Sequence, residues 1–215
     1  MANRKVYINT IAQIAGKIST ALISIVLIKI LTNYLDLEGY GLYAKIYNYL
    51  SIFSVIADLG LYTVSVREIS AHKDNPTKVR HIAGNILALR TLMGLAIIVI
   101  SLGLAFLLPG YHSGAALAGV AIAGVFTLFG LMNSSILSLL QAYLRTEFSF
   151  VSVTIGKITN LIAILATVFL LLPKPLTGAM IWGIERETLA FIAIIISGLI
   201  GNIVMTGLLY TYSRK

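Results

Sequence analysis

The chain has 215 residues, of which 58% are hydrophobic and 11% are charged, and its mean hydropathy is +0.93. A soluble domain carries about 25% charged residues, so this composition excludes an ordinary soluble protein and predicts a polytopic membrane protein. The absence of cysteine excludes disulfides, thiol nucleophiles and thiolate metal sites. The formal charge of +8 does not indicate nucleic-acid binding, because the basic residues form no soluble basic domain.

Six stretches are long and apolar enough to cross a bilayer, for which a helix needs roughly 20 predominantly apolar residues. In chain order they cover residues 7–33, 41–66, 82–108, 115–142, 148–171 and 188–211. The N-terminus lacks the short apolar core and cleavage site of a signal peptide, so we expect the first helix to be retained. The sequence predicts an all-α membrane bundle of six antiparallel transmembrane helices, forming a single lobe over residues 1–215.

Basic residues are concentrated in the connections on one side of the predicted membrane. That side carries Arg4, Lys5, Arg67, Lys73, Lys78, Arg80, Arg145, Arg214 and Lys215. The other side has two basic residues and four acidic ones, namely Lys174, Arg186, Asp36, Glu38, Glu185 and Glu187. Short loops rich in Lys and Arg stay in the cytoplasm, so both termini are predicted to be cytoplasmic, in a cell (inner) membrane.

The first two spans carry polar stripes at steps of three and four residues. In the first span the stripe consists of Asn9, Gln13, Gly16, Lys17, Thr20 and Ser24. In the second it consists of Tyr47, Ser51, Ser54, Asp58, Tyr62 and Ser65. A stripe of this period gives a helix a lipid side and an interior side. Both stripes include an ionisable residue, and a charge at the bilayer centre costs about 2.5–3.5 kcal/mol unless it faces a partner or water.

Lys17 and Asp58 lie at similar depth on adjacent helices, roughly 15 Å and roughly 12 Å along the helix from the same end. We expect Asp58 to face an aqueous cavity, the Lys17 ammonium, or both, and to act as a gating ion pair with Lys17. A purely structural ion pair is the alternative, because polar contacts often serve only to hold a membrane bundle together.

The later spans add further stripes and cations. The fourth span carries Thr127, Gly130, Ser134, Ser138 and Gln141, and the fifth carries Ser149, Ser152, Gly156, Asn160 and Thr167. Helix packing accounts for the fourth stripe as well as a cavity does. Arg90 and Lys157 lie roughly 12–14 Å inside the third and fifth spans, where cavity lining and snorkelling are equally open. Lys29 is expected to snorkel to the headgroups, and Lys45 to lie at the interface.

Cations outnumber carboxylates within the predicted spans, so a cavity lined by them should attract an anionic ligand. The candidate substrate-binding residues are Lys17, Arg90, Lys157, Gln13 and Asn160. The three histidines lie in loops or at span ends without metal-ligand spacing, and no catalytic motif is present. We therefore expect no enzyme activity, no metal and no cofactor.

Residues 27–70 also resemble the start of polysaccharide-biosynthesis (O-antigen, Wzx-type) flippases of the MATE/MOP superfamily. The matching positions are Lys29 and Leu31, Glu38, Tyr40-Gly41-Leu42-Tyr43, Asp58-Leu59-Gly60-Leu61 and Arg67-Glu68. Beyond residue 100 the likeness is mainly the spacing of hydrophobic spans. The resemblance implies the N-terminal six-helix lobe of a transporter that translocates lipid-linked oligosaccharides by alternating access.

The family usually has 12 to 14 helices in two lobes, so the resemblance also implies a second six-helix lobe or a homodimer partner. The other implied partners are the bilayer and an anionic lipid-linked sugar, without nucleic acid. Two alternatives remain open. One is a multidrug or cation extruder of the same superfamily, whose lumen should present carboxylates. The other is a non-transporting half-lobe with a structural or partner-binding role.

Overall fold

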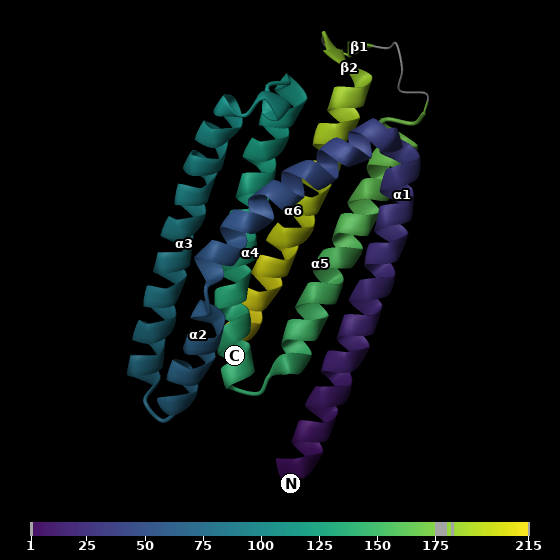
Figure 1. The fold of residues 1–215 in the computed structure, drawn as a ribbon. Coiled ribbons are helices and arrows are strands. Elements are labelled where there is room, and N and C mark those ends of the chain that lie inside the picture. Colours follow the sequence, from purple (N-terminus) through teal and green to yellow (C-terminus); the bar gives the residue numbers. More distant parts are fainter. Residues whose placement is uncertain (1, 175–179, 182, 215) are drawn as a thin grey trace.

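The computed structural model describes residues 2–174, 180–181 and 183–214, without the side chains of residues 2–10, 12 and 13. Over these residues it contains five helices that are long and apolar enough to cross a membrane (Figure 1). They are α1 (Ala2–Asp58), α3 (Pro76–Leu107), α4 (Gly114–Ala142), α5 (Thr146–Ala166) and α6 (Arg186–Ser213). Shorter elements are α2 (Leu61–Ala71), η1 (Pro109–Tyr111), the π-helical turn η2 (Thr167–Leu171), β1 (Met180–Ile181) and β2 (Ile184–Glu185). The predicted helical membrane bundle is confirmed.

The first two predicted spans are joined in α1, which accounts for five long helices where the sequence predicted six. Asp36 interrupts the helical dihedral angles with φ 59° and ψ −173°. We call residues 2–35 the first arm of α1 and residues 37–58 the second arm. Each arm exceeds the roughly 20 residues that a span requires. An ion pair of 2.9 Å between Lys174 Nζ and Asp36 Oδ1 and a hydrogen bond of 2.5 Å from the Tyr34 hydroxyl to the Leu172 carbonyl join the bend to the segment after α5.

The second predicted span, residues 41–66, is not one continuous helix. The second arm ends at Asp58, the backbone has positive φ angles at Leu59 (23°) and Gly60 (85°), and α2 then begins at Leu61. Glycine tolerates the left-handed conformation at position 60 because it has no Cβ. The pattern of apolar residues continues through this break, so hydropathy alone could not locate it.

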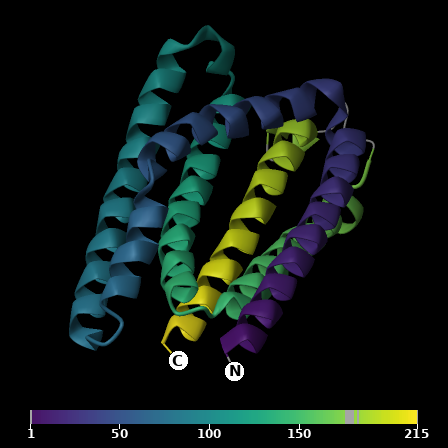
Figure 2. The ribbon, with the colours of Figure 1, turned by 60° about the horizontal axis from the view of Figure 1, so that its bottom comes forward.

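The helix α4 lies at the centre of the bundle and packs against the second arm, α2, α3 and α6. The first arm packs instead against α5, and the second arm crosses from the bend towards α3 (Figures 1 and 2). At the contact between the second arm and α4, a Cβ added to Gly119 would lie 2.6 Å from Ile46 Cδ1. The core between these elements is fully buried at Ile46, Val120 and Ile195.

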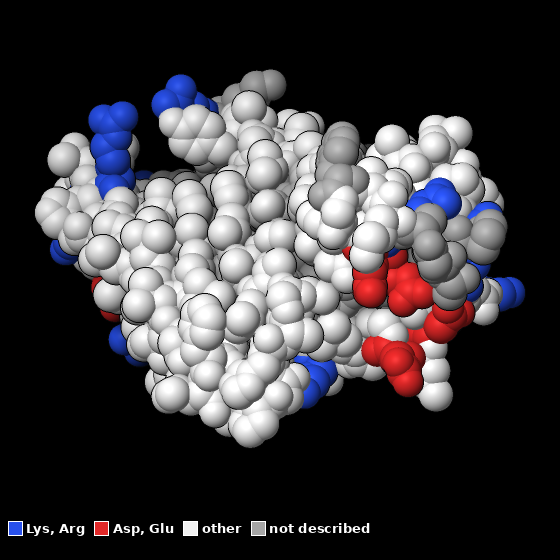
Figure 3. Space-filling model, turned by 90° about the horizontal axis from the view of Figure 1, so that it is seen from above, with Lys and Arg blue, Asp and Glu red and all other residues white. Residues whose placement is uncertain are grey.

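Both termini lie at one end of the bundle, which we call the terminal end; the bend at Asp36 lies at the other, the distal end (Figure 1). A hollow of about 530 Å³ at the distal end is lined by the carboxylate residues Asp36, Glu38, Glu185 and Glu187. Figure 3 views this end and shows acidic side chains gathered on one side of it. Large apolar side chains are exposed along α1 and α3, including Ile25, Val55 and Val99, as a lipid-facing surface requires.

Asp36→Gly is expected to raise the free energy of unfolding by about 1 kcal/mol. A non-glycine residue in this region of φ and ψ costs about 1–3 kcal/mol, whereas the exposed ion pair with Lys174 contributes at most about 1 kcal/mol. Asp36→Ala loses the ion pair and keeps the strain, so it should be destabilising. Thermal unfolding of both variants in the same detergent measures the difference; a Gly variant no more stable than the Ala variant would contradict the strain.

The predicted orientation can be tested at the exposed residues Asp74, at the terminal end, and His112, at the distal end. The chain has no cysteine, so Asp74→Cys and His112→Cys each introduce a unique thiol. In intact cells a membrane-impermeant thiol reagent should label position 112 and leave position 74 unlabelled until the cells are opened. Labelling at position 74 and not at position 112 would show that the orientation is the opposite of the predicted one.

Candidate functional site

The carboxylate of Asp58 forms an ion pair with the guanidinium of Arg90 on α3. Arg90 Nη2 donates to Asp58 Oδ1 at 2.5 Å, and Nη1 approaches the Leu131 carbonyl of α4 at 3.5 Å. The Arg90 side chain is 0% exposed, and that of Asp58 is 42% exposed. The pair therefore joins the second arm to α3 beside α4. There the buried guanidinium of Arg90 also approaches the carbonyl oxygen of Leu131.

The predicted ion pair between Asp58 and Lys17 was wrong. Among the residues whose side chains are described, Lys17 forms no ion pair, and Asp58 pairs with Arg90. The physical reason is the path of the second arm, which crosses towards α3 while the first arm stays against α5 (Figure 2). Equal depth along two successive helices does not bring their side chains together when the helices diverge.

Lys17 instead lines a pocket of about 360 Å³ between the first arm, α2, α4 and α5, which we call the Lys17 pocket. Its polar lining residues are Lys17, Thr20, Tyr62, Gln141, Thr146 and Ser149. No Asp or Glu is among its lining residues within the described part of the chain. Lys17 itself is exposed, so its ammonium group is accessible to a ligand.

Most of these polar residues come from the stripes predicted in four different spans. Lys17 and Thr20 belong to the first stripe, Tyr62 to the second, Gln141 to the fourth and Ser149 to the fifth. The stripes thus converge on one pocket. Sequence analysis did not propose Tyr62, Gln141 or Ser149 as binding residues; their membership in the stripes was the signal that could have identified them.

Tyr62 connects the Lys17 pocket with the buried ion pair. Its hydroxyl donates a hydrogen bond to Gln141 Oε1 inside the pocket. The same residue lies four positions after Asp58, near the pair that Asp58 forms with Arg90. Because Tyr62 follows the break at Gly60, a change in the angle between the second arm and α2 would move this side chain.

The other predicted site residues lie elsewhere. Lys157 Nζ donates to the Thr20 carbonyl at 3.1 Å and to Ser24 Oγ at 2.8 Å, so it bridges α5 and the first arm at the edge of the pocket and does not snorkel. Arg90 is buried and paired with Asp58, and Asn160 lies at the crossing of α5 and α6, next to Gly201. The side chain of Gln13 lies outside the described residues.

The two remaining cations have separate positions. Lys45 donates to the Gly110 carbonyl at 2.7 Å and lies 4.5 Å from the centre of the Tyr111 ring, so it joins the second arm to the connection at the distal end. Lys29 is exposed on the first arm. Neither lines the Lys17 pocket.

Comparison with known proteins decides the family. A family model described as polysaccharide biosynthesis protein matches residues 6–213, almost the whole chain. The chain belongs to the polysaccharide biosynthesis protein family. This is the family of Wzx-type polysaccharide biosynthesis flippases, so the resemblance of residues 27–70 is confirmed, and a membrane transport role in polysaccharide biosynthesis follows. Comparisons with curated proteins and with solved structures gave no significant match.

Proposed function

We propose that this chain takes part in flipping a lipid-linked oligosaccharide or polysaccharide precursor across the cytoplasmic membrane by alternating access. The observation that carries the proposal is the Lys17 pocket, in which an accessible ammonium group is set among hydroxyl and amide side chains. Lipid-linked sugar precursors carry a pyrophosphate, which accepts charge-assisted hydrogen bonds from groups of this kind.

The balance of charge supports an anionic substrate. Asp58, the carboxylate within the first two predicted spans, is already paired with Arg90 and does not neutralise Lys17. Lys157 lies one helical turn from the pocket, held by Thr20 and Ser24. A pocket with net positive charge in a low-dielectric surrounding concentrates anions.

The exposure of Lys17 supports the presence of a second protein surface that faces the Lys17 pocket across the transport path. A polar pocket on the surface of a membrane bundle would otherwise face lipid, where unpaired charge is costly. We propose that a second six-helix lobe, or a second copy of this chain, faces it. Alternating access would then rock the two walls against each other, with the break at Leu59–Gly60 allowing α2 and Tyr62 to move relative to the second arm.

An extruder of cationic drugs is less well supported. Such a protein should present carboxylates to its substrate, and the lining of the Lys17 pocket contains none among the described residues. A purely structural half-lobe would not need an accessible lysine in a polar pocket. These alternatives differ from the flippase in their response to substitutions at position 17.

Lys17→Gln is expected to reduce translocation at least tenfold, and Lys17→Arg should retain part of it. A hydrogen bond to a charged group is worth about 1.5–3 kcal/mol, which corresponds to roughly 10- to 150-fold in binding. The measurement is accumulation of lipid-linked precursor in the inner leaflet of cells that depend on this chain, at matched expression. Lys29→Gln, on the same arm and outside the pocket, is the control. Equal effects of the Lys17→Gln and Lys29→Gln changes, or a fully active Lys17→Gln variant, would refute the assignment of the pocket.

A further inference from the structure

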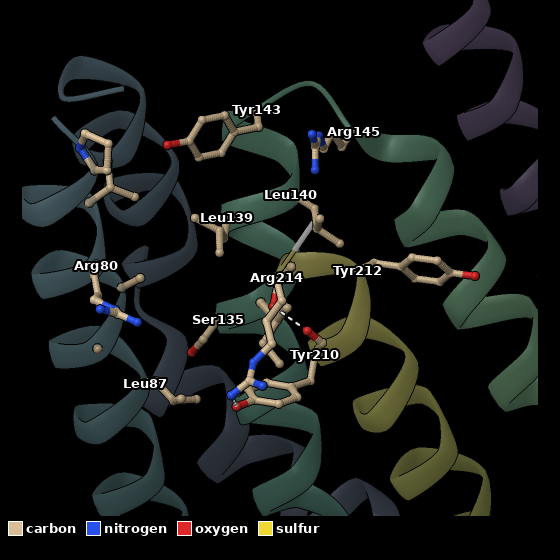
Figure 4. A pocket seen from close by; sticks show the side chains of 16 residues that line it. Arg80, Leu87, Ser135, Leu139, Leu140, Tyr143, Arg145, Tyr210, Tyr212 and Arg214 are labelled. Atoms are coloured by element: carbon tan, nitrogen blue, oxygen red, sulfur yellow. Dashed lines mark hydrogen bonds between the residues drawn. The ribbon is translucent and has the colours of Figure 1, made fainter. Parts of the chain in front are cut away.

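A second basic hollow lies at the terminal end of the bundle, apart from the Lys17 pocket. It has a volume of about 610 Å³ and lies over α4 between α3 and α6 (Figure 4). None of the residues that line the Lys17 pocket lines this one. We call it the arginine pocket, after Arg80 on α3, Arg145 at the start of α5 and Arg214 at the end of α6.

The three arginines are not matched by acidic groups. No Asp or Glu lines the arginine pocket among the described residues, and neither Arg80 nor Arg145 takes part in the ion pairs found there. Arg214 stacks on Tyr210, with its guanidinium carbon 4.4 Å from the ring centre, and also donates to the Tyr210 hydroxyl. In Figure 4 Arg80 and Arg145 extend towards Arg214 from two sides of the hollow.

The wall of the pocket combines arginine side chains with apolar ones. The arginines come from helix ends, where the headgroup layer of a bilayer lies if the helices span it. The lining also includes apolar side chains, with Leu140 near the end of α4 and Leu87 and Ile136 further along the helices. A ligand that fits both parts has an anionic head and an apolar body, and an arginine fork matches the oxygens of a phosphate better than any other side chain.

We propose that the arginine pocket binds the phosphate headgroup of an anionic glycerophospholipid from the leaflet at the terminal end of the bundle. Basic pockets between transmembrane helices bind anionic headgroups in this way, and anionic lipids are enriched in the cytoplasmic leaflet. A lipid held there contacts α3, α4 and α6 together and stabilises their packing. This proposal is independent of which substrate the Lys17 pocket binds.

The test uses the full chain in a neutral detergent, titrated with fluorescent phosphatidylglycerol and, separately, phosphatidylcholine. The variant Arg80→Gln/Arg145→Gln removes two pocket charges and leaves the stacked Arg214 in place. The matched control Arg67→Gln/Lys78→Gln removes two exposed charges from the same end outside the pocket. We expect the pocket variant to bind phosphatidylglycerol about thirtyfold more weakly, since each basic residue near an anionic headgroup contributes roughly fivefold, and the control less than about twofold.

Four results would overturn the proposal. Equal weakening by the two variants would mean general surface electrostatics, and equal binding of phosphatidylcholine by the unaltered chain would mean no recognition of charge. Full competition by inorganic phosphate or pyrophosphate at the concentration at which the lipid binds would assign the pocket to a free phosphate. Unfolding midpoints of both variants without lipid should agree within a few degrees; if the pocket variant alone is unstable, Arg80→Lys/Arg145→Lys, which keeps the charges, must restore stability and lipid binding, or the proposal fails.

Discussion

Asp58→Asn should lower the free energy of unfolding by about 3 kcal/mol, although the residue lies at a helix end. The substitution leaves the guanidinium of Arg90 charged, 0% exposed and without its carboxylate. Removing one partner of a buried ion pair costs about 3–5 kcal/mol. We expect the lower end of this range, because Asp58 is 42% exposed and water screens part of the interaction.

The double variant Asp58→Asn/Arg90→Met should recover at least half of the loss, since it removes the buried charge together with its partner. Thermal unfolding in detergent at matched protein concentration gives the comparison. Lys17→Gln provides the control, because Lys17 forms no ion pair with Asp58 in this structure. Its effect should add to that of Asp58→Asn without coupling. A rescue of Asp58→Asn by Lys17→Gln, and none by Arg90→Met, would restore Lys17 as the partner.

The position of the spans was predictable because a bilayer imposes a length and a composition on every helix that crosses it. The ranges predicted for the third and fourth spans, residues 82–108 and 115–142, lie within about six residues of the ends of α3 and α4. The bend at Asp36 was not predictable as part of one helix, since two carboxylates followed by a glycine, Asp36, Glu38 and Gly39, are typical of a loop. The break at Gly60 was hidden because apolar residues continue on both sides of it.

The candidate site was predictable in part for a similar reason. Polar stripes identify the side of each helix that avoids lipid, and residues from four of them line the Lys17 pocket. A stripe does not identify the neighbouring helix, which depends on tilt and crossing. Arg90 therefore could be placed at the right depth without being recognised as the partner of Asp58, and Lys157 without its contacts to Thr20 and Ser24.

The crossing of α5 and α6 depends on two glycines that face each other. A Cβ added to Gly201 would lie 2.6 Å from the Gly156 carbonyl oxygen and 2.8 Å from Asn160 Cβ, and one added to Gly156 would lie 2.9 Å from the Gly201 carbonyl oxygen. The obstructing atoms at Gly201 include backbone, which cannot rotate away. Small residues allow helices in a membrane to approach closely, so that packing and not hydrophobicity holds them together.

Gly201→Leu is accordingly expected to lower the free energy of unfolding by about 3 kcal/mol, at the upper end of the usual cost of overpacking, because the two helices must separate along their contact. This corresponds to a fall of roughly 6–12 °C in the unfolding midpoint for a chain of this size. Gly207→Leu is the matched control on the same helix, since Gly207 is exposed and nothing lies within 4 Å of its added Cβ. The control should be neutral or slightly stabilising, because leucine forms helices better than glycine. Thermal unfolding and the yield of monodisperse protein in one detergent measure both variants. If Gly201→Leu matches the control, α5 and α6 do not cross at these glycines, and the placement of Asn160 between them and away from the Lys17 pocket would have to be abandoned as well.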